Sequence, residues 1–313
     1  GSEMCIRDRF KTPVNKIRLF EHGAPGSQNL KLTRKYYTED MPDGRVKHIV
    51  QNITDPDIVP YIPDGIGNST DRQRIPAVLI IPGGAFRRLV YNFEGEDVAK
   101  WLNSMGIAAF VLECRLPSDE HDNAEDVPLI DAMRAMRVIR GRAQEFGIDE
   151  AKIGVMGFSA GGFMAALLST AYESDVYADY KYKDEYDKLS ARPDFAVCSY
   201  PVISIDDCIE AGKRYMSEEQ VLERISDGKA KILHKYNPDK LVRPDMPPVF
   251  ICETDDDRTT LSENSVGFYM AARKAGVSAE LHIFRTGGHG YGCGDDFAQT
   301  GAVSYTHLTL PTT

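Results

Sequence analysis

A serine placed between two glycines is the residue of this chain with the clearest capacity for chemistry. Ser159 lies in the pentapeptide 157–161, after a short apolar run at 153–156 and before a segment rich in Ala, Leu and Met. A strand, Gly-x-Ser-x-Gly and a helix together predict a nucleophile elbow, with the serine at the tip of a sharp turn. The glycines allow the strand and the helix to approach closely, and the helix start offers N–H groups to a developing anion. The pentapeptide alone also fits an ordinary glycine-rich turn.

A serine nucleophile needs a base, and His289 is the predicted one. It follows the last strand-like run, 279–284, and it lies between Gly288 and Gly290. Flexible neighbours of this kind allow a loop that brings the imidazole over Oγ of Ser159. Structural roles are predicted for five other histidines: His22, His48, His121, His234 and His282.

The acid that orients the base should come from three consecutive aspartates after the apolar run 249–252. The same cluster could be a solvated acidic turn, or it could hold Ca²⁺, although the remaining ligands of a calcium loop are missing. We predict Asp256 as the acid, with Asp257 second and Asp255 third. The chosen carboxylate would accept a hydrogen bond from Nδ1–H of His289 and stabilise the imidazolium.

The loop after the aliphatic run 77–81 is the predicted second half of an oxyanion hole. One backbone N–H should come from Ala160, directly after the serine, and the other from Gly84 or Ala85. Pro82 has no N–H to donate. The alternative is an ordinary Pro-Gly-Gly turn. Losing one oxyanion donor costs about 3–4 kcal/mol of transition-state stabilisation.

Four aromatic residues close to these motifs are candidates for binding substrate: Phe86, Tyr91, Phe158 and Tyr291. Each could equally be a packing residue. Arg87 and Arg88 follow the oxyanion loop and could meet a polar or anionic leaving group, although exposed arginines are commonly only solvated.

The elements that must position these residues alternate between strand-like and helix-like runs, which predicts the α/β class. Continuous aliphatic runs such as 77–81 are typical of a parallel sheet that helices cover on both faces. Runs at 46–51 and 58–62 predict an antiparallel start of this sheet. We expect one domain over residues 10–301, with a polar, partly helical insertion at 203–245 that caps the site.

The composition fits an ordinary globular protein and limits its partners. The chain has 313 residues, of which 42% are hydrophobic and 27% charged, and its formal charge of −10 argues against nucleic acid and anionic membranes. No apolar run has the length of a membrane span. The six cysteines lie scattered without metal-ligand spacing, so we expect no metal and no cofactor. Reduced, buried thiols make the cytoplasm the default location, with the natural N-terminus missing.

The two ends of the chain differ from the rest. Residues 1–9 and 302–313 resemble translated sequencing-adaptor read-through on gene fragments from environmental DNA. We therefore expect both ends to be non-native tails and leave them out of the fold prediction.

Taken together, several motifs resemble α/β-hydrolase esterases of the acetyl-xylan-esterase-like kind, which are carbohydrate esterases. They are residues 82–86, 155–162, 247–248, 256–257, 263–265 and 287–290, and the resemblance extends over about 24–292. It implies an α/β-hydrolase fold with Ser159, Asp256 and His289 as the catalytic triad. It also implies a bacterial serine esterase that removes acetyl or feruloyl groups from small-molecule or oligosaccharide esters through an acyl-enzyme.

The chain departs from this family at three places. Ala85 stands where a third glycine is common, so a positive φ there would be less comfortable. Cys114 stands where the family often has a tyrosine. The final helix of the family is expected to be missing, which would leave part of one sheet face uncovered and promote association into a homo-oligomer. Two alternative functions are a serine peptidase resembling the prolyl oligopeptidases, because of the Asp-Asp-Arg sequence at 256–258, and a non-catalytic binding protein with a hydrolase fold.

Overall fold

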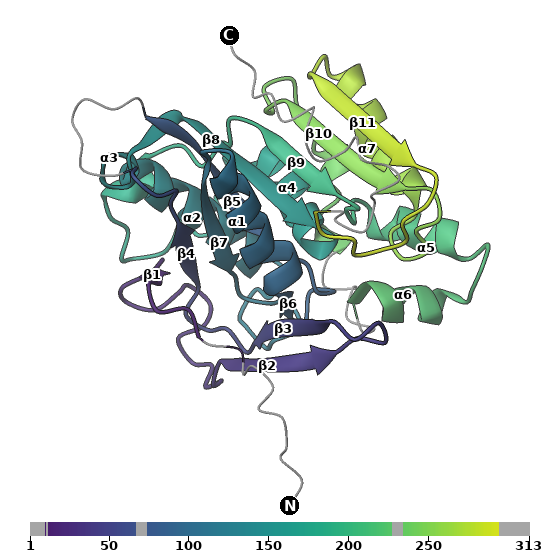
Figure 1. Cartoon of the computed structure of the whole chain (residues 1–313), viewed down its shortest axis with the longest axis horizontal. Helices are drawn as coiled ribbons and strands as arrows, with labels where there is room; N and C mark the ends of the chain where they lie inside the picture. The colour runs from purple at the N-terminus through teal and green to yellow at the C-terminus, as the bar shows by residue number, and fades with distance from the viewer. Residues whose placement is uncertain (1–9, 11, 67–73, 227–233, 294–313) are drawn as a thin grey trace, which may run out of the picture.

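The fold is organised around a mostly parallel sheet of eight strands. The computed structural model describes residues 10, 12–66, 74–226 and 234–293. Within them, the strand order is β1-β4-β7-β5-β8-β9-β10-β11, and the run from β7 to β11 is parallel (Figure 1). The antiparallel strands β4 and β1 close one edge. The strands are β1 (Ile17–Arg18), β4 (Asp57–Tyr61), β5 (Ile75–Ile81), β7 (Ala108–Glu113), β8 (Ile148–Phe158), β9 (Ala196–Ser199), β10 (Val249–Thr254) and β11 (Ala279–Phe284).

Helices on both faces bury the central strands. Every residue of β7 is buried, as are the last five of β5 and the last six of β8. Continuous burial of this kind requires apolar side chains at successive positions, which explains the aliphatic runs in the sequence. The predicted α/β-hydrolase fold is confirmed.

The helices form two layers around the sheet. Figure 1 shows α1 in front of the strands, whereas α2 and α4 pack against each other behind them. The helix α7 packs on β10 and β11. The helices are α1 (Asp97–Ser104), α2 (Val127–Gly141), α3 (Ala143–Phe146), α4 (Ala160–Ala171), α5 (Ile205–Gly212), α6 (Glu218–Ser226) and α7 (Ser262–Lys274).

A separate three-stranded antiparallel sheet lies against the oxyanion loop. Its order is β2 (Lys35–Asp40), β3 (Val46–Gln51) and β6 (Leu89–Val90), and β6 directly follows the loop. The expected antiparallel start at 58–62 is β4 of the large sheet, but 46–51 belongs to this second sheet instead. Alternation of apolar and polar residues identifies a strand but not the sheet that it joins.

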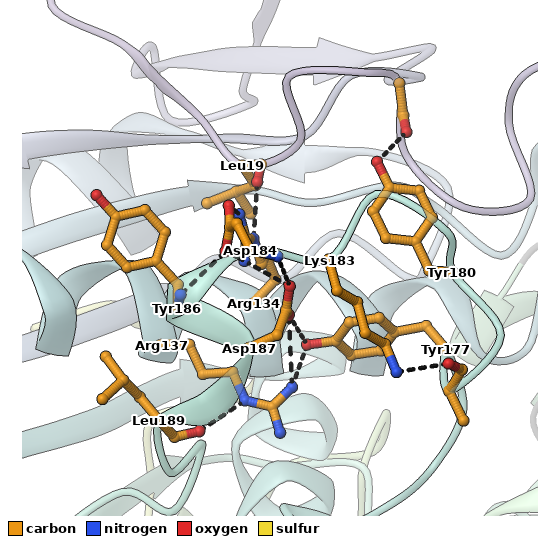
Figure 2. A network of polar contacts seen from close by, with 12 residues as sticks. Leu19, Arg134, Arg137, Tyr177, Tyr180, Lys183, Asp184, Tyr186, Asp187 and Leu189 are labelled. Carbon is orange, nitrogen blue, oxygen red and sulfur yellow. Dashed lines mark hydrogen bonds and ion pairs between the residues drawn. The ribbon is translucent and has the colours of Figure 1, made fainter.

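The long irregular segment between α4 and β9 is fixed to α2 by arginines of that helix (Figure 2). The guanidinium of Arg134 pairs with Asp184 at 2.5 Å and with Asp187 at 3.1 Å. One turn along the helix, Nε of Arg137 donates to the carbonyl oxygen of Leu189 at 2.9 Å. These contacts therefore hold the segment in a fixed position on α2.

The predicted insertion contains α5, α6 and the 3₁₀ turn η4 (Pro238–Lys240). Its start is tied to α7, because Oδ1 of Asn264 accepts from the N–H of Ile203 at 2.7 Å and of Ser204 at 2.9 Å. The helix α5 then packs on α6 and α7. That this segment caps the site stays a prediction.

The expected non-native tails and the missing final helix concern residues outside the described part of the chain. On β10 and β11, the half-buried rings of Phe250, His282 and Phe284 follow one another, with centroids 5.3 Å and 6.2 Å apart. The association expected from an uncovered face stays a prediction. In the described part of the chain, no helix combines the length and the hydropathy that crossing a membrane requires.

Candidate active site

Ser159 occupies the sharp turn between β8 and α4 that the sequence predicts. Its backbone angles are φ 53° and ψ −117°, a conformation that side-chain-bearing residues rarely adopt and that costs about 1–3 kcal/mol. The end of β9 holds the turn in place, because the N–H of Ser159 donates to the carbonyl oxygen of Ser199 and its own carbonyl oxygen accepts from Val202. A Cβ on Gly157 or on Gly161 would lie 2.0 Å from a backbone oxygen, so both positions require glycine.

The hydroxyl of Ser159 lies in a continuous chain of hydrogen bonds with a histidine and an aspartate. Its Oγ is 2.8 Å from Nε2 of His289, and Nδ1 of the same ring is 2.6 Å from Oδ2 of Asp257. The sequence placed His289 over the serine, and the geometry agrees. Such a chain lets the imidazole take the serine proton while the carboxylate fixes the tautomer.

Asp256, the acid chosen from the sequence, does not contact His289, and this choice is corrected to Asp257. The Asp256 side chain is exposed, and its Oδ1 accepts from the N–H of Gly288 at 2.8 Å. Asp257 is buried and turns inward, where it also accepts from the N–H groups of Thr259 and Thr260. Successive residues in a turn point in different directions, and the sequence could not tell which one faces the ring. Asp255 is also exposed.

The surroundings of Asp257 keep its carboxylate ionised. Burial by itself would raise the pKa of Asp257, but the hydrogen bond and charge of His289 and the two backbone N–H groups outweigh it and lower the pKa. Glu253 lies nearby at the end of β10, and burial together with the charge of Asp257 raises its pKa well above the usual range. The pKa values of these two neighbouring carboxyl groups are thus shifted in opposite directions, and the lowered one belongs to Asp257, which contacts His289.

The loop predicted to complete the oxyanion hole has an unusual backbone. Gly84, Ala85 and Phe86 have φ values of 141°, 56° and 60°. The strain expected at Ala85 is therefore present. Within the described residues, no hydrogen-bond acceptor faces the N–H of Gly84, Ala85 or Ala160. Gly84 and Ala85 line the same pocket as Ser159.

A buried glutamate that the sequence did not point to connects the oxyanion loop to the loop that carries His289. Oε2 of Glu94 accepts from the N–H of Gly83 at 2.8 Å, and Oε1 accepts from the hydroxyl of Tyr200 at 2.8 Å. The same hydroxyl accepts from the N–H of Gly292 at 3.0 Å, and the Tyr200 ring lies 5.1 Å from the ring of His289. Glu94 belongs to the π-helical turn η1 (Asn92–Glu96), and an acid with other acids close by in a turn gives no sequence signal of burial.

Replacing Glu94 should impair the chemical step more than substrate binding. In Glu94→Gln the amide nitrogen cannot accept, so Gly83 or Tyr200 loses its acceptor, at a cost of about 1–3 kcal/mol for a buried donor. We expect kcat for an aryl acetate to fall by about 10- to 100-fold, with KM changed by less than about threefold. Steady-state kinetics measure this split.

The matched control is Glu96→Gln, two residues further along, where the carboxylate pairs with Lys100 at the surface at 2.8 Å. It should change kcat by less than about twofold, because surface pairs contribute about 0–1 kcal/mol. A thermal melt of Glu94→Gln shows whether the loss of kcat comes with a loss of folding stability. If Glu94→Gln keeps the kcat of the parent, Glu94 has no positioning role.

A pocket of about 340 Å³ opens above the serine. The hairpin of β2 and β3 contributes Met41, Arg45 and Lys47 to its wall, and the oxyanion loop contributes Arg87 and Arg88. Other lining residues include Val90, Phe93, Glu94, Val202, Thr259, His289 and Gly290.

Four aromatic residues predicted to bind substrate are absent from the described lining of this pocket, and their role in binding stays a prediction: Phe86, Tyr91, Phe158 and Tyr291. Phe86, Tyr91 and Phe158 are buried in the core. The ring of Tyr291 is half-buried and packs on the ring of Tyr200, with the two centroids 4.5 Å apart. Closeness to a motif in sequence does not fix the direction of a ring, and Phe93 is the aromatic residue that reaches the pocket wall.

The parallel sheet, the strained serine turn and the serine–histidine–aspartate chain define an α/β-hydrolase. Comparisons with known proteins give the family. The BD-FAE family model matches residues 66–271, and the chain belongs to this family.

Three relatives illustrate the similarity. An acetylxylan esterase of Xylanibacter ruminicola is 31% identical over 223 residues, which are 71% of this chain and 42% of that protein. An endo-1,4-beta-xylanase B of Butyrivibrio fibrisolvens is 31% identical over 227 residues, 72% of this chain and 34% of that protein. The chain thus spans less than half the length of these curated relatives. The crystal structure of an acetyl ester-xyloside bifunctional hydrolase from Caldicellulosiruptor lactoaceticus is 34% identical with a TM-score of 0.65, covering 91% of this chain and 90% of that one.

Proposed function

We propose that this chain is a serine carboxylester hydrolase that removes acyl groups, acetyl above all, from carbohydrate esters. The observation that carries the proposal is the chain of contacts from Ser159 through His289 to the buried Asp257, at a nucleophile elbow that opens into a pocket. The similarity to an acetylxylan esterase and to an acetyl ester-xyloside bifunctional hydrolase supports the acetyl group and the sugar. Feruloyl esters are the second acyl class that we propose.

In the proposed reaction, Oγ of Ser159 attacks the acyl carbon while Nε2 of His289 takes its proton. The carbonyl oxygen becomes an oxyanion that accepts from the N–H of Ala160 and of Gly84 or Ala85. Collapse of this intermediate breaks the ester bond, and the imidazolium returns the proton to the leaving alcohol. Water then attacks the acyl-enzyme with the same base, which releases the carboxylic acid and restores the serine.

Two assays on the purified full chain test the proposal. We expect it to hydrolyse an aryl acetate and to lose this activity when a fluorophosphonate labels one residue per molecule, which peptide mass spectrometry should locate at Ser159. Acetylated xylo-oligosaccharides should release acetate, whereas a proline-containing peptide anilide should stay intact. Labelling at another residue, or cleavage of the anilide alone, would contradict the proposed esterase.

A further inference from the structure

The pocket above Ser159 has a charge opposite to that of the whole chain. Among its described lining residues are four cations, Arg45, Lys47, Arg87 and Arg88, and one acid, Glu94. The chain itself has a formal charge of −10. A group of cations at the mouth of a concave site, on an otherwise acidic molecule, attracts anions to that place.

The single acid in the lining does little to offset these cations. Glu94 is 5% exposed, and its two oxygens already accept from the N–H of Gly83 and the hydroxyl of Tyr200. Burial raises the pKa of Glu94, against the smaller opposing effects of its hydrogen bonds and of the charges of His289 and Lys47. Its carboxyl group is directed into the protein wall, away from a ligand in the pocket.

The carboxylates that pair with two of the cations lie outside the pocket lining. Asp43 pairs with Arg45 at 2.8 Å, and Glu39 pairs with Arg88 at 2.5 Å. Both acids are on the hairpin of β2 and β3. The pair of Asp43 and Arg45 is exposed, and such pairs are weak and screened by salt, whereas Glu39 and Arg88 are half-buried. A second contact positions Arg45, whose guanidinium lies 5.3 Å from the centroid of the Phe93 ring, itself part of the pocket wall.

Lys47 and Arg87 line the pocket from two adjoining elements, because β3 pairs with β6 and Nε2 of Gln51 on β3 donates to the carbonyl oxygen of Arg87 at 3.2 Å. Lys47 is half-buried in the middle of the three-stranded sheet, on β3, opposite Glu39 of β2. Arg87 closes a tight turn, in which its backbone N–H donates to the carbonyl oxygen of Gly84 at 3.3 Å. All four cations therefore belong to the lining of the pocket that contains Ser159.

We propose that this site selects esters that carry a carboxylate close to the scissile bond, such as an acetylated sugar whose neighbouring unit is a uronic acid. The proposal rests on the proposed esterase function and deepens it. A carboxylate near two or three cations in a partly enclosed pocket gains a Coulomb attraction that a neutral ester of the same shape does not.

Matched ester pairs test the charge preference, with one arm for each side of the ester bond. For the alcohol side, the pair is an acetylated methyl glucuronoside and its C6 amide. For the acyl side, the pair is an aryl hemisuccinate and the aryl butyrate. We expect kcat/KM to be at least about fivefold higher for the anionic member of one pair at low salt, because attraction in a focusing cleft raises capture of charged substrates. At about 0.5 M NaCl the ratio should fall towards about one, since screening then acts over a few ångströms.

Lys47→Gln should lower that ratio by about threefold, as expected for the loss of one partly screened cation. The matched control is Lys35→Gln, because Lys35 lies on β2 of the same hairpin but outside the pocket lining, and it should leave the ratio unchanged. A salt-sensitive preference in either arm that Lys47→Gln reduces supports the proposal. Ratios near one in both arms, with Ser159-dependent hydrolysis of the neutral esters, overturn it and leave the esterase function intact. Absence of Ser159-dependent hydrolysis of every ester overturns the function itself.

Discussion

Ser159→Ala should lose about 10⁴-fold or more of kcat/KM for an aryl acetate, because removing the nucleophile of a serine hydrolase leaves only the oxyanion hole and substrate binding. The variant should fold, since alanine removes one oxygen and keeps the Cβ within the strained turn. Initial rates cover the required range when the variant is assayed at high enzyme concentration and the parent at a much lower one. The residual rate over water then measures what the N–H groups of the oxyanion loop contribute without the serine.

Ser169→Ala is the matched control, ten residues further along on α4. Its hydroxyl donates only to the carbonyl oxygen of Ala165 at 2.7 Å, within the same helix. We expect activity within about twofold of the parent, as for a local bond that adds little to helix stability. Equal rates for Ser159→Ala and the parent would remove Ser159 as the nucleophile.

The sequence was most informative where several levels of structure impose the same requirement. At 157–161, a buried strand, a tight turn and a helix all need small residues, and the two glycines are irreplaceable because a Cβ would meet backbone oxygen. Continuous aliphatic runs identified the parallel strands for a similar reason, since both of their faces are covered. In these cases local pattern and global fold agree.

The parts that the sequence could not supply depend on the direction of individual side chains. The pocket lining is one example, because Met41, Arg45 and Lys47 come from a hairpin more than 100 residues before the serine. The buried position of Glu94 is another, because its two donors, Gly83 and Tyr200, come from separate loops. Contacts between residues so distant in sequence leave no periodic or local signal.

The choice between Asp256 and Asp257 is the sharpest test of the site, because these neighbours have the same chemistry and different surroundings. Asp257→Asn should lower kcat by about 10³- to 10⁴-fold, since an amide in contact with Nδ1 no longer favours the tautomer that lets Nε2 accept the serine proton. Because the pKa of Asp257 lies below its ordinary value, the parent carboxylate stays ionised across neutral pH. Protonation of Asp257 should therefore make no contribution to the pH dependence of the parent's kcat between about pH 6 and about pH 8.

Asp256→Asn provides the comparison at the adjacent position. Its amide oxygen can still accept from the N–H of Gly288, so the loop that carries His289 should keep its position. We expect kcat within about threefold of the parent, as for an exposed hydrogen bond that is replaced rather than removed. Asp256→Ala, which removes that acceptor, should cost somewhat more, by about three- to tenfold, because the backbone before His289 is then less constrained. If Asp256→Asn were the more damaging of the two asparagine variants, Asp256 would be the residue that orients His289 in the active enzyme. The contact between Asp257 and His289 would then belong to a resting arrangement of the loop.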